Sequence, residues 1–368
     1  MLTILLIAAT LAVAYANGAN DNFKGVATLH GSGAATYRTA LTLTTVATAC
    51  GGLISVVFAA GLIKTFSSAG VVPAEIAASP AFLTAIACGA AGTVFLATIV
   101  GLPISTTHAL TGAIVGAGLV AVGTELNFSV LGKSFILPLL LGPFISIALT
   151  SLVYFAATRI SRRFGKVGDP CLCVEEAPVL ATTGTLAFDA GSRLSLTARA
   201  SADDCDNVQG LRLTGSGAAN AVHFVSAGML CLARGMNDAP KIVALLLAAN
   251  ALKVENGLIA IVFAMALGGI INARKVARTM SHRISHMSEG QALSANIVSA
   301  ALVIAASRFG LPVSTTHVTV GAITGTGLIN RTANLRVLGG IAASWVGTLP
   351  LAALLAALAG LLLKFTPS

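Results

Sequence analysis

The sequence predicts an all-α polytopic membrane protein, and its composition carries that prediction. Hydrophobic residues make up 56% of the 368 positions and charged residues only 10%, whereas soluble domains average about 25% charged residues. The mean hydropathy is +0.90, and the 38 glycines are typical of membrane helices that pack closely. A soluble globule of this size could not bury so much apolar surface, so the composition excludes an ordinary cytosolic enzyme.

Apolar segments long enough to cross a membrane recur along the chain. A spanning helix needs roughly 20 apolar residues. Some segments are shorter and others are interrupted by polar residues, so we expect about ten to twelve membrane segments, including discontinuous helices and two re-entrant hairpins. The segments cover residues 1–30, 38–62, 81–100, 108–122, 130–158, 218–250, 256–272, 291–307, 317–329 and 337–364.

A polar segment, residues 159–217, separates two hydrophobic parts, residues 1–158 and 218–368. It contains 7 of the 13 acidic residues, and its content of Ser, Thr and Gly is typical of weakly ordered chain. We interpret it as a cytoplasmic linker between two membrane domains. Cys171 and Cys173 lie in this linker, but their spacing differs from that of a zinc site, so free thiols and a metal site both remain open.

The two hydrophobic parts repeat each other. Gly-Ala-Asn-Asp-Asn-Phe-Lys at 18–24 corresponds to Gly-Met-Asn-Asp-Ala-Pro-Lys at 235–241. Gly-Leu-Pro-Ile-Ser-Thr-Thr-His at 101–108 corresponds to Gly-Leu-Pro-Val-Ser-Thr-Thr-His at 310–317, and extending this pair to 18 positions gives 12 identities. Because two separate motifs recur in the same order at similar spacing, we infer an internal duplication.

Loop charges indicate how the two repeats are oriented. The loop near residues 63–80 holds one basic residue, whereas its counterpart near residues 273–290 holds four. Lys and Arg accumulate in cytoplasmic loops, so the two loops favour opposite faces of the membrane, which predicts repeats of inverted topology. The net charge of +9 therefore reflects topology and not nucleic-acid binding, since no basic stripe with interleaved aromatic residues is present.

Two acidic residues, Asp21 and Asp238, lie inside apolar segments at matching places of the repeats. A charge at mid-bilayer costs at least ~2.5–3.5 kcal/mol and usually marks a pathway. The neighbouring Gly and Asn residues favour a helix break, where backbone carbonyls, the amides of Asn20 and Asn237 and the two carboxylates would form a site for a hard cation. The alternative is a structural pairing of each acid with the lysine three residues later.

The Pro-x-Ser-Thr-Thr-His segments predict the complementary chemistry. Pro103 or Pro312 ends one helix, and the hydroxyl residues begin the next, so free N–H groups and the positive end of a helix dipole lie at each tip. Such N-termini bind phosphate, sulfate or carboxylate, and two tips meeting from opposite faces would enclose a tetrahedral oxyanion. The alternative is a pair of ordinary helix caps at the membrane surface. The hydroxyl residues expected to bind the anion are Ser105, Thr106, Thr107, Ser314, Thr315 and Thr316.

These paired motifs resemble those of the inorganic phosphate transporter (PiT) family, across residues 1–158 and 218–364. The resemblance implies an inverted-repeat secondary transporter that takes up phosphate together with Na⁺ or H⁺ and holds the anion at the Ser-Thr-Thr tips. A related branch of the family carries sulfate. The resemblance assigns ion coupling, with Na⁺ as the one metal ion considered, to Asn20, Asp21, Asn237 and Asp238.

Four basic residues depart from the family pattern or from the repeat. The family's usual run is Gly-Ala-Asn-Asp-Val-Ala-Asn-Ala, whereas this chain has Lys24 and Lys241 at the position of the second Asn. A built-in ammonium either takes the electrostatic role of a bound cation or binds the anion, so we expect both lysines to tune the charge of the site. Arg234 and Arg308 stand where the first repeat has uncharged residues. A guanidinium there either binds the oxyanion or places its charge at the membrane interface.

We therefore predict a secondary active transporter of the inner membrane that imports inorganic phosphate by symport with H⁺ or Na⁺. A sulfate permease of the same family and an anion channel are the alternatives, although buried acids would repel an anion in a channel. No ATP-binding loop is present, and His108 and His317 lack the orienting acid of a hydrolase, so we expect no enzyme activity. The expected partners are phosphate or sulfate, the coupling ion and the lipid bilayer, with no nucleic acid, no cofactor beyond Na⁺, and a homodimer left open.

Overall fold

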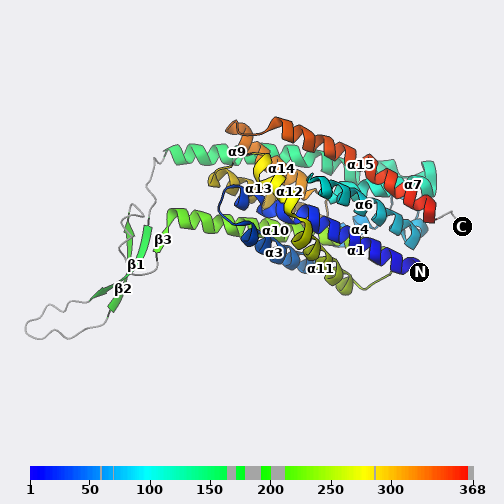
Figure 1. Cartoon of the computed structure of the whole chain (residues 1–368), viewed down its shortest axis with the longest axis horizontal. Helices are drawn as coiled ribbons and strands as arrows, with labels where there is room; N and C mark the ends of the chain where they lie inside the picture. Colours follow the sequence, from blue (N-terminus) through cyan, green and yellow to red (C-terminus); the bar gives the residue numbers. More distant parts are fainter. Residues whose placement is uncertain are drawn as a thin grey trace, which may run out of the picture. The chain divides into compact units, whose positions relative to one another are not determined.

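A computed structural model of the chain describes residues 1–58, 60–68, 70–163, 171–178, 192–199, 212–285 and 287–363 (Figure 1). The chain forms two compact units. The larger unit contains Met1–Tyr154 and Val225–Ser368, so the helices of both hydrophobic halves share one body. The smaller unit is Phe155–Phe224, and both predicted linker boundaries fall inside it.

The helices follow the predicted apolar segments. In the described part of the chain, eight helices are long and apolar enough to cross a membrane. The two other predicted segments, 218–250 and 317–329, are also helical, although the first contains three buried charged residues and the second has a helix of only 15 residues. The two hydrophobic halves thus form an all-α polytopic membrane protein, as predicted.

The elements run in chain order through the first half, the linker and the second half. The first half contains α1 (Leu2–Asp21), the 3₁₀ turn η1 (Asn22–Val26), α2 (Ala27–Gly31), α3 (Tyr37–Phe58), α4 (Ala60–Phe66), α5 (Ala74–Ala77), α6 (Pro80–Val100), α7 (Thr106–Val122), the 3₁₀ turn η2 (Gly123–Glu125), α8 (Phe128–Leu131), the π turn η3 (Gly132–Ile136) and α9 (Leu137–Arg163). The linker contains the strands β1 (Cys171–Pro178), β2 (Ser192–Arg199) and β3 (Arg212–Thr214). The second half contains α10 (Gly215–Ala248), α11 (Val254–Asn272), α12 (Arg274–Arg278), the π turn η5 (Thr279–Arg283), α13 (Glu289–Arg308), α14 (Thr315–Ile329) and α15 (Leu335–Leu363).

Glycines bring α1 of the first half against α11 of the second. A Cβ on Gly18 would lie 1.9 Å from the carbonyl oxygen of Met265, and a Cβ on Gly268 would lie 1.9 Å from the carbonyl oxygen of Tyr15. Only a residue without a side chain permits such an approach of two backbones. The first helix of one repeat therefore crosses the second helix of the other repeat at a fixed point.

The same crossing recurs between α10 and α3. A Cβ on Gly235 would lie 2.1 Å from the carbonyl oxygen of Thr48, and a Cβ on Gly51 would lie 2.0 Å from that of Leu232. These four residues occupy the positions that correspond, in the repeat, to the four residues of the α1–α11 crossing. The contacts of one half are thus repeated by the other half with the roles exchanged.

The two helical hairpins, α6–α7 and α13–α14, are held in the same exchanged manner. A Cβ on Gly112 of α7 would lie 2.3 Å from the carbonyl oxygen of Leu349 in α15, and a Cβ on Gly321 of α14 would lie 2.7 Å from that of Pro143 in α9. The last helix of each half therefore packs on the hairpin of the other half. In Figure 1 the α6–α7 hairpin extends towards the end of the bundle that carries the N-terminus, and the α13–α14 hairpin extends towards the other end.

The predicted helix break occurs in the first half only. α1 ends at Asp21, and the chain continues as the 3₁₀ turn η1 before α2 begins at Ala27. In the second half, α10 passes through Asn237 and Asp238 without interruption, so the break predicted there is wrong. Pro240 lies inside this helix. Its fixed φ suits a helix, and the hydrogen bond that it removes is tolerated where neighbouring helices surround the backbone.

The linker contains a small sheet that its composition did not predict. β1 pairs antiparallel with both β2 and β3, which gives the strand order β2-β1-β3. The register places Cys171 opposite Arg199 and Pro178 opposite Ser192. The side chains of Cys171 and Cys173 lie outside the described part of the chain, so the choice between free thiols and a metal site there stays a prediction.

Candidate functional site

Five charged side chains are buried at the centre of the larger unit. Asp21 and Asp238 are 2% and 3% exposed, and Lys24, Lys241 and Arg234 are each 1% exposed. The acidic residues outside the linker and these two positions are exposed instead: Glu75, Glu125, Glu255 and Glu289. A charge removed from water is stable only when it is paired and hydrogen-bonded, so these five groups must be satisfied by one another or by a ligand.

The two hairpin tips contact each other beside these charges. The hydroxyl of Thr107 donates to the carbonyl oxygen of Val313 at 3.4 Å. The hydroxyl of Thr316 donates to the carbonyl oxygen of Ile104 at 2.8 Å. The tips therefore meet, as the sequence predicted, and each one supplies the acceptor for the other's threonine.

Each tip is the N-terminus of a helix. α7 begins at Thr106 and α14 at Thr315, and Ser105 and Ser314 are the residues that cap them. Each serine hydroxyl accepts a hydrogen bond from the backbone N–H three residues later, at 3.2 Å, which is the geometry of a helix cap. The first N–H groups of each helix have no acceptor within the helix, so each tip presents donors at the positive end of a helix dipole.

A glycine turn precedes each tip. Gly101 has a φ of +80° and Gly310 a φ of +66°, in the left-handed region that favours glycine. α6 and α13 end before these glycines, so the glycine reverses the chain and the following Pro103 or Pro312 keeps the tip out of a helix. The proline therefore acts after the helix has already ended.

Lys24 is surrounded by oxygen atoms from both halves. Its Nζ pairs with the carboxylate of Asp21 and lies within hydrogen-bonding distance of Oδ1 of Asn20 (3.0 Å), the carbonyl oxygen of Ile104 (2.5 Å) and the hydroxyl of Thr316 (2.6 Å). A carboxylate, an amide, a carbonyl and a hydroxyl are the oxygen ligands that hard metal cations take in proteins. The ammonium group thus occupies the kind of position that a bound cation would fill.

Lys241 repeats this arrangement from the second half. Its Nζ donates to the hydroxyl of Thr107 and to the carbonyl oxygen of Val313, both at 2.8 Å, and lies 3.6 Å from a carboxylate oxygen of Asp238. Each lysine therefore contacts the carbonyl of its own tip and the threonine of the other tip. The two ammonium groups join the tips together.

Asn17 and Arg234 connect the two aspartates. The amide of Asn17 donates to Asp21 at 3.1 Å and to Asp238 at 3.3 Å. The guanidinium of Arg234 donates to Oδ1 of Asn17 at 2.9 Å, and its Nε lies 3.5 Å from a carboxylate oxygen of Asp238. Asn17 and Arg234 occupy corresponding positions of the repeat. The two halves therefore contact each other through equivalent positions, one of which is neutral and the other positively charged.

The asparagines predicted for ion coupling fasten their helices to the tips. Oδ1 of Asn20 accepts a hydrogen bond from the backbone N–H of Ile104 at 3.1 Å. The amide of Asn237 donates to the carbonyl oxygen of Val313 at 3.2 Å. Both asparagines therefore hold the backbone of the tip on which the adjacent lysine also acts.

Sequence reasoning missed three contributors to the site. Thr98 accepts a hydrogen bond from the amide of Asn20 at 3.0 Å, and Ser307 donates one to Asn237 at 3.3 Å. These two hydroxyl residues stand three positions before Gly-Leu-Pro in both repeats, and that recurrence was the available signal. The third is Asn17, a polar residue one helical turn before the first aspartate.

The two histidines of the tips stack on each other. The ring centroids of His108 and His317 lie 4.4 Å apart, with an interplanar angle of 16°. The ring of His317 lies 3.7 Å from that of Trp345, whose Nε1 donates to the carbonyl oxygen of Pro103 at 3.3 Å. This geometry fits a packing role for the histidines. It also places the chain's single tryptophan against both tips.

Arg308 does not belong to the buried cluster. It lies exposed in the last turn of α13, whereas Arg234 is buried among the aspartates. The prediction that both arginines lie near the site is therefore wrong for Arg308. Its exposure agrees with the alternative, in which a long basic side chain places its charge at the membrane interface.

The buried cluster holds three cationic groups against two carboxylates, an excess of one positive charge. Two helix N-termini add further positive potential at the same place. No cluster of three or more His, Cys, Asp and Glu side chains suited to a metal ion occurs in the part of the chain that the structure describes. The arrangement is suited to an anion that is held by two helix ends and by tethered cations.

Comparisons with known proteins identify the family of the chain. A model of the phosphate transporter family matches residues 17–356. A probable low-affinity inorganic phosphate transporter of Bacillus subtilis is 27% identical over 99% of this chain and 98% of its own length, and one of Mycobacterium tuberculosis is 26% identical over 97% and 76%. A solved structure, the sodium-dependent phosphate transporter, shares the fold with a TM-score of 0.77 and 20% identity over 99% of both chains. The chain is a multi-pass membrane transport protein and belongs to the phosphate transporter family.

Proposed function

We propose that this protein imports inorganic phosphate by coupling its movement to that of an ion. The observation that carries the proposal is the meeting of two helix N-termini with Lys24 and Lys241 at one buried point. Phosphate is a tetrahedral anion that can accept hydrogen bonds on every side. The tips offer N–H and hydroxyl donors from two directions, and the ammonium groups offer charge-assisted bonds.

The anion would take over the bonds that now join the tips. Lys24 donates to Thr316, and Lys241 donates to Thr107, so each ammonium now binds a neutral hydroxyl. A phosphate oxygen is a stronger acceptor for these groups because it is charged. In this proposal Ser105 and Ser314 act mainly through the helix N-termini that they cap, and the threonines contact the anion.

The aspartates and their neighbouring asparagines form the proposed coupling centre. A proton on Asp21 or Asp238 would weaken the aspartate–lysine pair and leave the ammonium free to bind the anion. The same oxygen atoms would suit Na⁺, but Lys24 and Lys241 already occupy them. These contacts favour H⁺ over Na⁺ as the coupling ion.

Uptake of labelled phosphate into proteoliposomes tests the proposal. We expect accumulation above equilibrium under an imposed inward H⁺ gradient, and no accumulation by the variant Asp21→Asn, because its side chain can no longer exchange a proton. The matched control is Glu75→Gln, which removes an exposed acid and should accumulate phosphate normally. Normal accumulation by Asp21→Asn would contradict the coupling role of this residue.

The alternative functions give different results in the same vesicles. A sulfate permease would lose phosphate uptake when sulfate is added in modest excess, since both anions are tetrahedral. An anion channel would equilibrate phosphate but would not accumulate it under either an H⁺ or a Na⁺ gradient. Accumulation that sulfate leaves unchanged is the outcome that we expect.

A further inference from the structure

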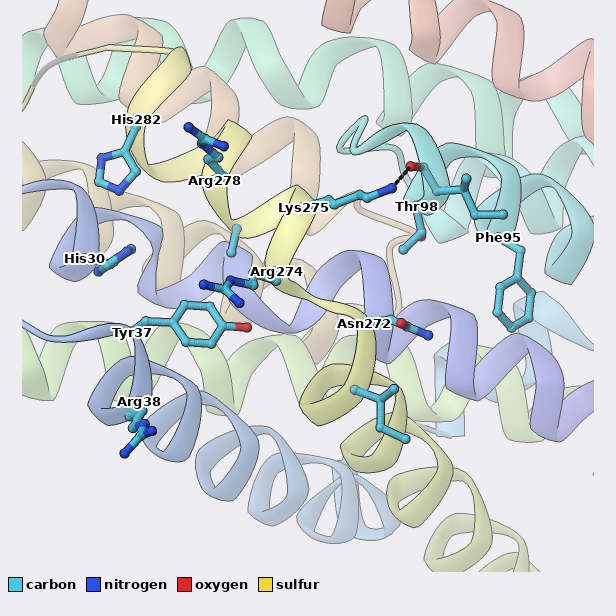
Figure 2. A pocket seen from close by; sticks show the side chains of 13 residues that line it. His30, Tyr37, Arg38, Phe95, Thr98, Asn272, Arg274, Lys275, Arg278 and His282 are labelled. Atoms are coloured by element: carbon cyan, nitrogen blue, oxygen red, sulfur yellow. Dashed lines mark hydrogen bonds between the residues drawn. The ribbon is translucent and has the colours of Figure 1, made fainter.

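A cavity with a basic lining lies beside the first hairpin tip. Its volume is about 860 Å³, and α2, α3, α6, α11, α12 and η5 contribute to its wall (Figure 2). The residues that line it include no Asp or Glu. The side chains in the lining that carry or can take a positive charge are His30, Arg38, Arg274, Lys275, Arg278 and His282.

Among the described residues, three arginines of this lining have no carboxylate partner. Arg38, Arg274 and Arg278 are exposed, and within the described residues no Asp or Glu forms an ion pair with any of them. Figure 2 shows Arg274 and Arg278 on α12 and Arg38 on α3, around the same space. Like charges that gather around one cavity repel one another unless an anion enters it.

The remaining basic residue of α12 has a structural role. Nζ of Lys275 donates to the carbonyl oxygen of Ile99 at 2.9 Å (Figure 2), and the hydroxyl of Thr279 donates to that of Gly101 at 2.9 Å. These two bonds fasten α12 and η5 to the end of α6, next to the first tip. Lys275 is thus occupied, and the arginines are the groups left to bind a ligand.

The wall of the cavity reaches the buried cluster through one side chain. Thr98 lines the cavity, and its hydroxyl accepts a hydrogen bond from the amide of Asn20 at 3.0 Å. Oδ1 of the same asparagine accepts a hydrogen bond from Lys24 at 3.0 Å. The side chains of Thr98 and Asn20 therefore connect the wall of the cavity to Lys24.

Membrane topology explains the sign of these charges but not their arrangement. A cytoplasmic loop accumulates Lys and Arg, and basic residues at any exposed position of the loop would satisfy this tendency. Arg283 belongs to the same segment and is exposed, yet it does not line the cavity. The two arginines of α12 instead share one cavity with Arg38 from another helix.

We propose that this cavity binds a phosphate group outside the buried cluster and is a vestibule in which the anion is held before or after it occupies the tips. The ligand is free inorganic phosphate or the headgroup of an anionic phospholipid. The exposed Ile99 and Ile271 would accompany the acyl chains of a lipid. The role in transport rests on the proposed function, whereas the binding itself can be measured separately.

Equilibrium dialysis of labelled inorganic phosphate against the full chain, in neutral detergent at low ionic strength, tests the proposal. We expect two classes of binding site. We call the cavity the outer class and the hairpin tips the inner class. The double variant Arg274→Gln with Arg278→Gln should lose the outer class and keep the inner one. The double variant Thr107→Val with Thr316→Val should lose the inner class and keep the outer one. Arg283→Gln with Arg336→Gln removes two exposed charges outside the cavity and should keep both classes.

The same variants have a kinetic signature in proteoliposomes. A cavity lined by charges of one sign attracts ions of the opposite sign. This attraction raises association rates by tenfold or more and weakens with salt. The double variant of α12 should therefore take up phosphate about tenfold more slowly at low phosphate, with an unchanged maximal rate and a weaker dependence on ionic strength. The single variant Arg278→Gln should show a smaller change in the same direction. It allows the test to be made even if the double variant misfolds.

The outcomes separate the vestibule from the inner site. Two binding classes in the double variant of α12 would overturn the vestibule, and an absent inner class in the wild type would overturn the proposed function while leaving the vestibule in place. Phosphatidylglycerol that displaces phosphate from the outer class, where phosphatidylcholine does not, would identify a lipid headgroup as the ligand. No displacement would identify free phosphate.

Discussion

The two halves of the molecule make matching contacts at their lysines and different contacts two turns earlier. Lys24 and Lys241 each bond the carbonyl of one tip and the threonine of the other. Asn17 and Arg234 also correspond to each other, but one is a neutral amide that bridges both aspartates and the other is a guanidinium. The two halves therefore share the lysine that binds the tips. They differ at the position of Asn17 and Arg234, where only the second half carries a positive charge.

The difference follows from where these positions lie. Asn17 and Arg234 touch each other at 2.9 Å, so identical residues there would be neighbours. Two arginines would place like charges in contact inside a buried cluster. Two asparagines would leave two carboxylates against two ammonium groups, without the excess positive charge that an anion needs. Under the proposed function, the departure of one central position from the repeat gives the duplicated site the excess positive charge that would bind an anion.

Removing one lysine should have the largest effect. Lys24→Met leaves Asp21 buried without an ion-pair partner, whereas in Lys241→Met the carboxylate of Asp238 keeps the guanidinium of Arg234 at 3.5 Å and should be less destabilised. Breaking a buried ion pair on one side costs about 3–5 kcal/mol, so we expect a large loss of thermal stability in detergent and no phosphate uptake. Pairing Lys24→Met with Asp21→Asn should restore stability but not uptake. Normal uptake by either lysine variant would break the comparison.

The exchanged helix crossings should be the next most sensitive. Gly51→Ala and Gly268→Ala place a Cβ about 2 Å from a backbone carbonyl oxygen, and overpacking typically costs about 1–3 kcal/mol. Both variants should lower the melting temperature by similar amounts if the crossings are equivalent. The control is Gly339→Ala, whose Cβ would have no neighbour within 4 Å. Equal melting temperatures for all three proteins would contradict the packing described.

Arg234→Asn makes the second half match the first and so sharpens the comparison. The variant removes hydrogen bonds from a charged group to Asn17, Asn22 and Thr48, and such bonds contribute about 1.5–3 kcal/mol each. We expect the affinity for phosphate to fall about tenfold or more, measured by quenching of Trp345 fluorescence. The exposed Arg308→Asn should leave the affinity unchanged, and an equal loss in both variants would contradict the central position of Arg234.

The capping serines should give the smallest effect and the closest match between the halves. Ser105→Ala and Ser314→Ala each remove an N-cap, which costs about 1 kcal/mol. Both should lower thermal stability slightly and shift phosphate affinity less than Thr107→Val or Thr316→Val. A larger loss of affinity in the serine variants than in the threonine variants would move direct anion binding from the threonines to the serines.

Much of the fold could be predicted because the lengths of the apolar segments and the repeated motifs are visible in the sequence. The ten segments and the meeting of the two tips were predicted in this way. The crossing of each half over the other was not, because it depends on which glycine meets which carbonyl, as at Gly18 and Met265. The unbroken course of α10 was missed since glycine and asparagine favour a break locally, whereas the surrounding helices stabilise the continuous form.

The site was predicted where chemistry and repetition agreed. The aspartates, lysines and threonines stood out as polar residues at matching places in apolar segments. Thr98 and Ser307 did not, because a hydroxyl in a membrane helix commonly bonds its own backbone. The basic cavity was not predicted either: its arginines come from α3 and α12, and only the folded chain brings Arg38 beside Arg274 and Arg278.

The central claim is that Lys24 and Lys241 take the place of a coupling cation. It is tested most directly by phosphate uptake with and without Na⁺, in the wild type and in Lys24→Asn with Lys241→Asn, which restores the residue of the family's usual run. We predict that the wild type accumulates phosphate under an H⁺ gradient in the complete absence of Na⁺, and that the double variant accumulates it only when Na⁺ is present. A wild type that requires Na⁺ would contradict the claim.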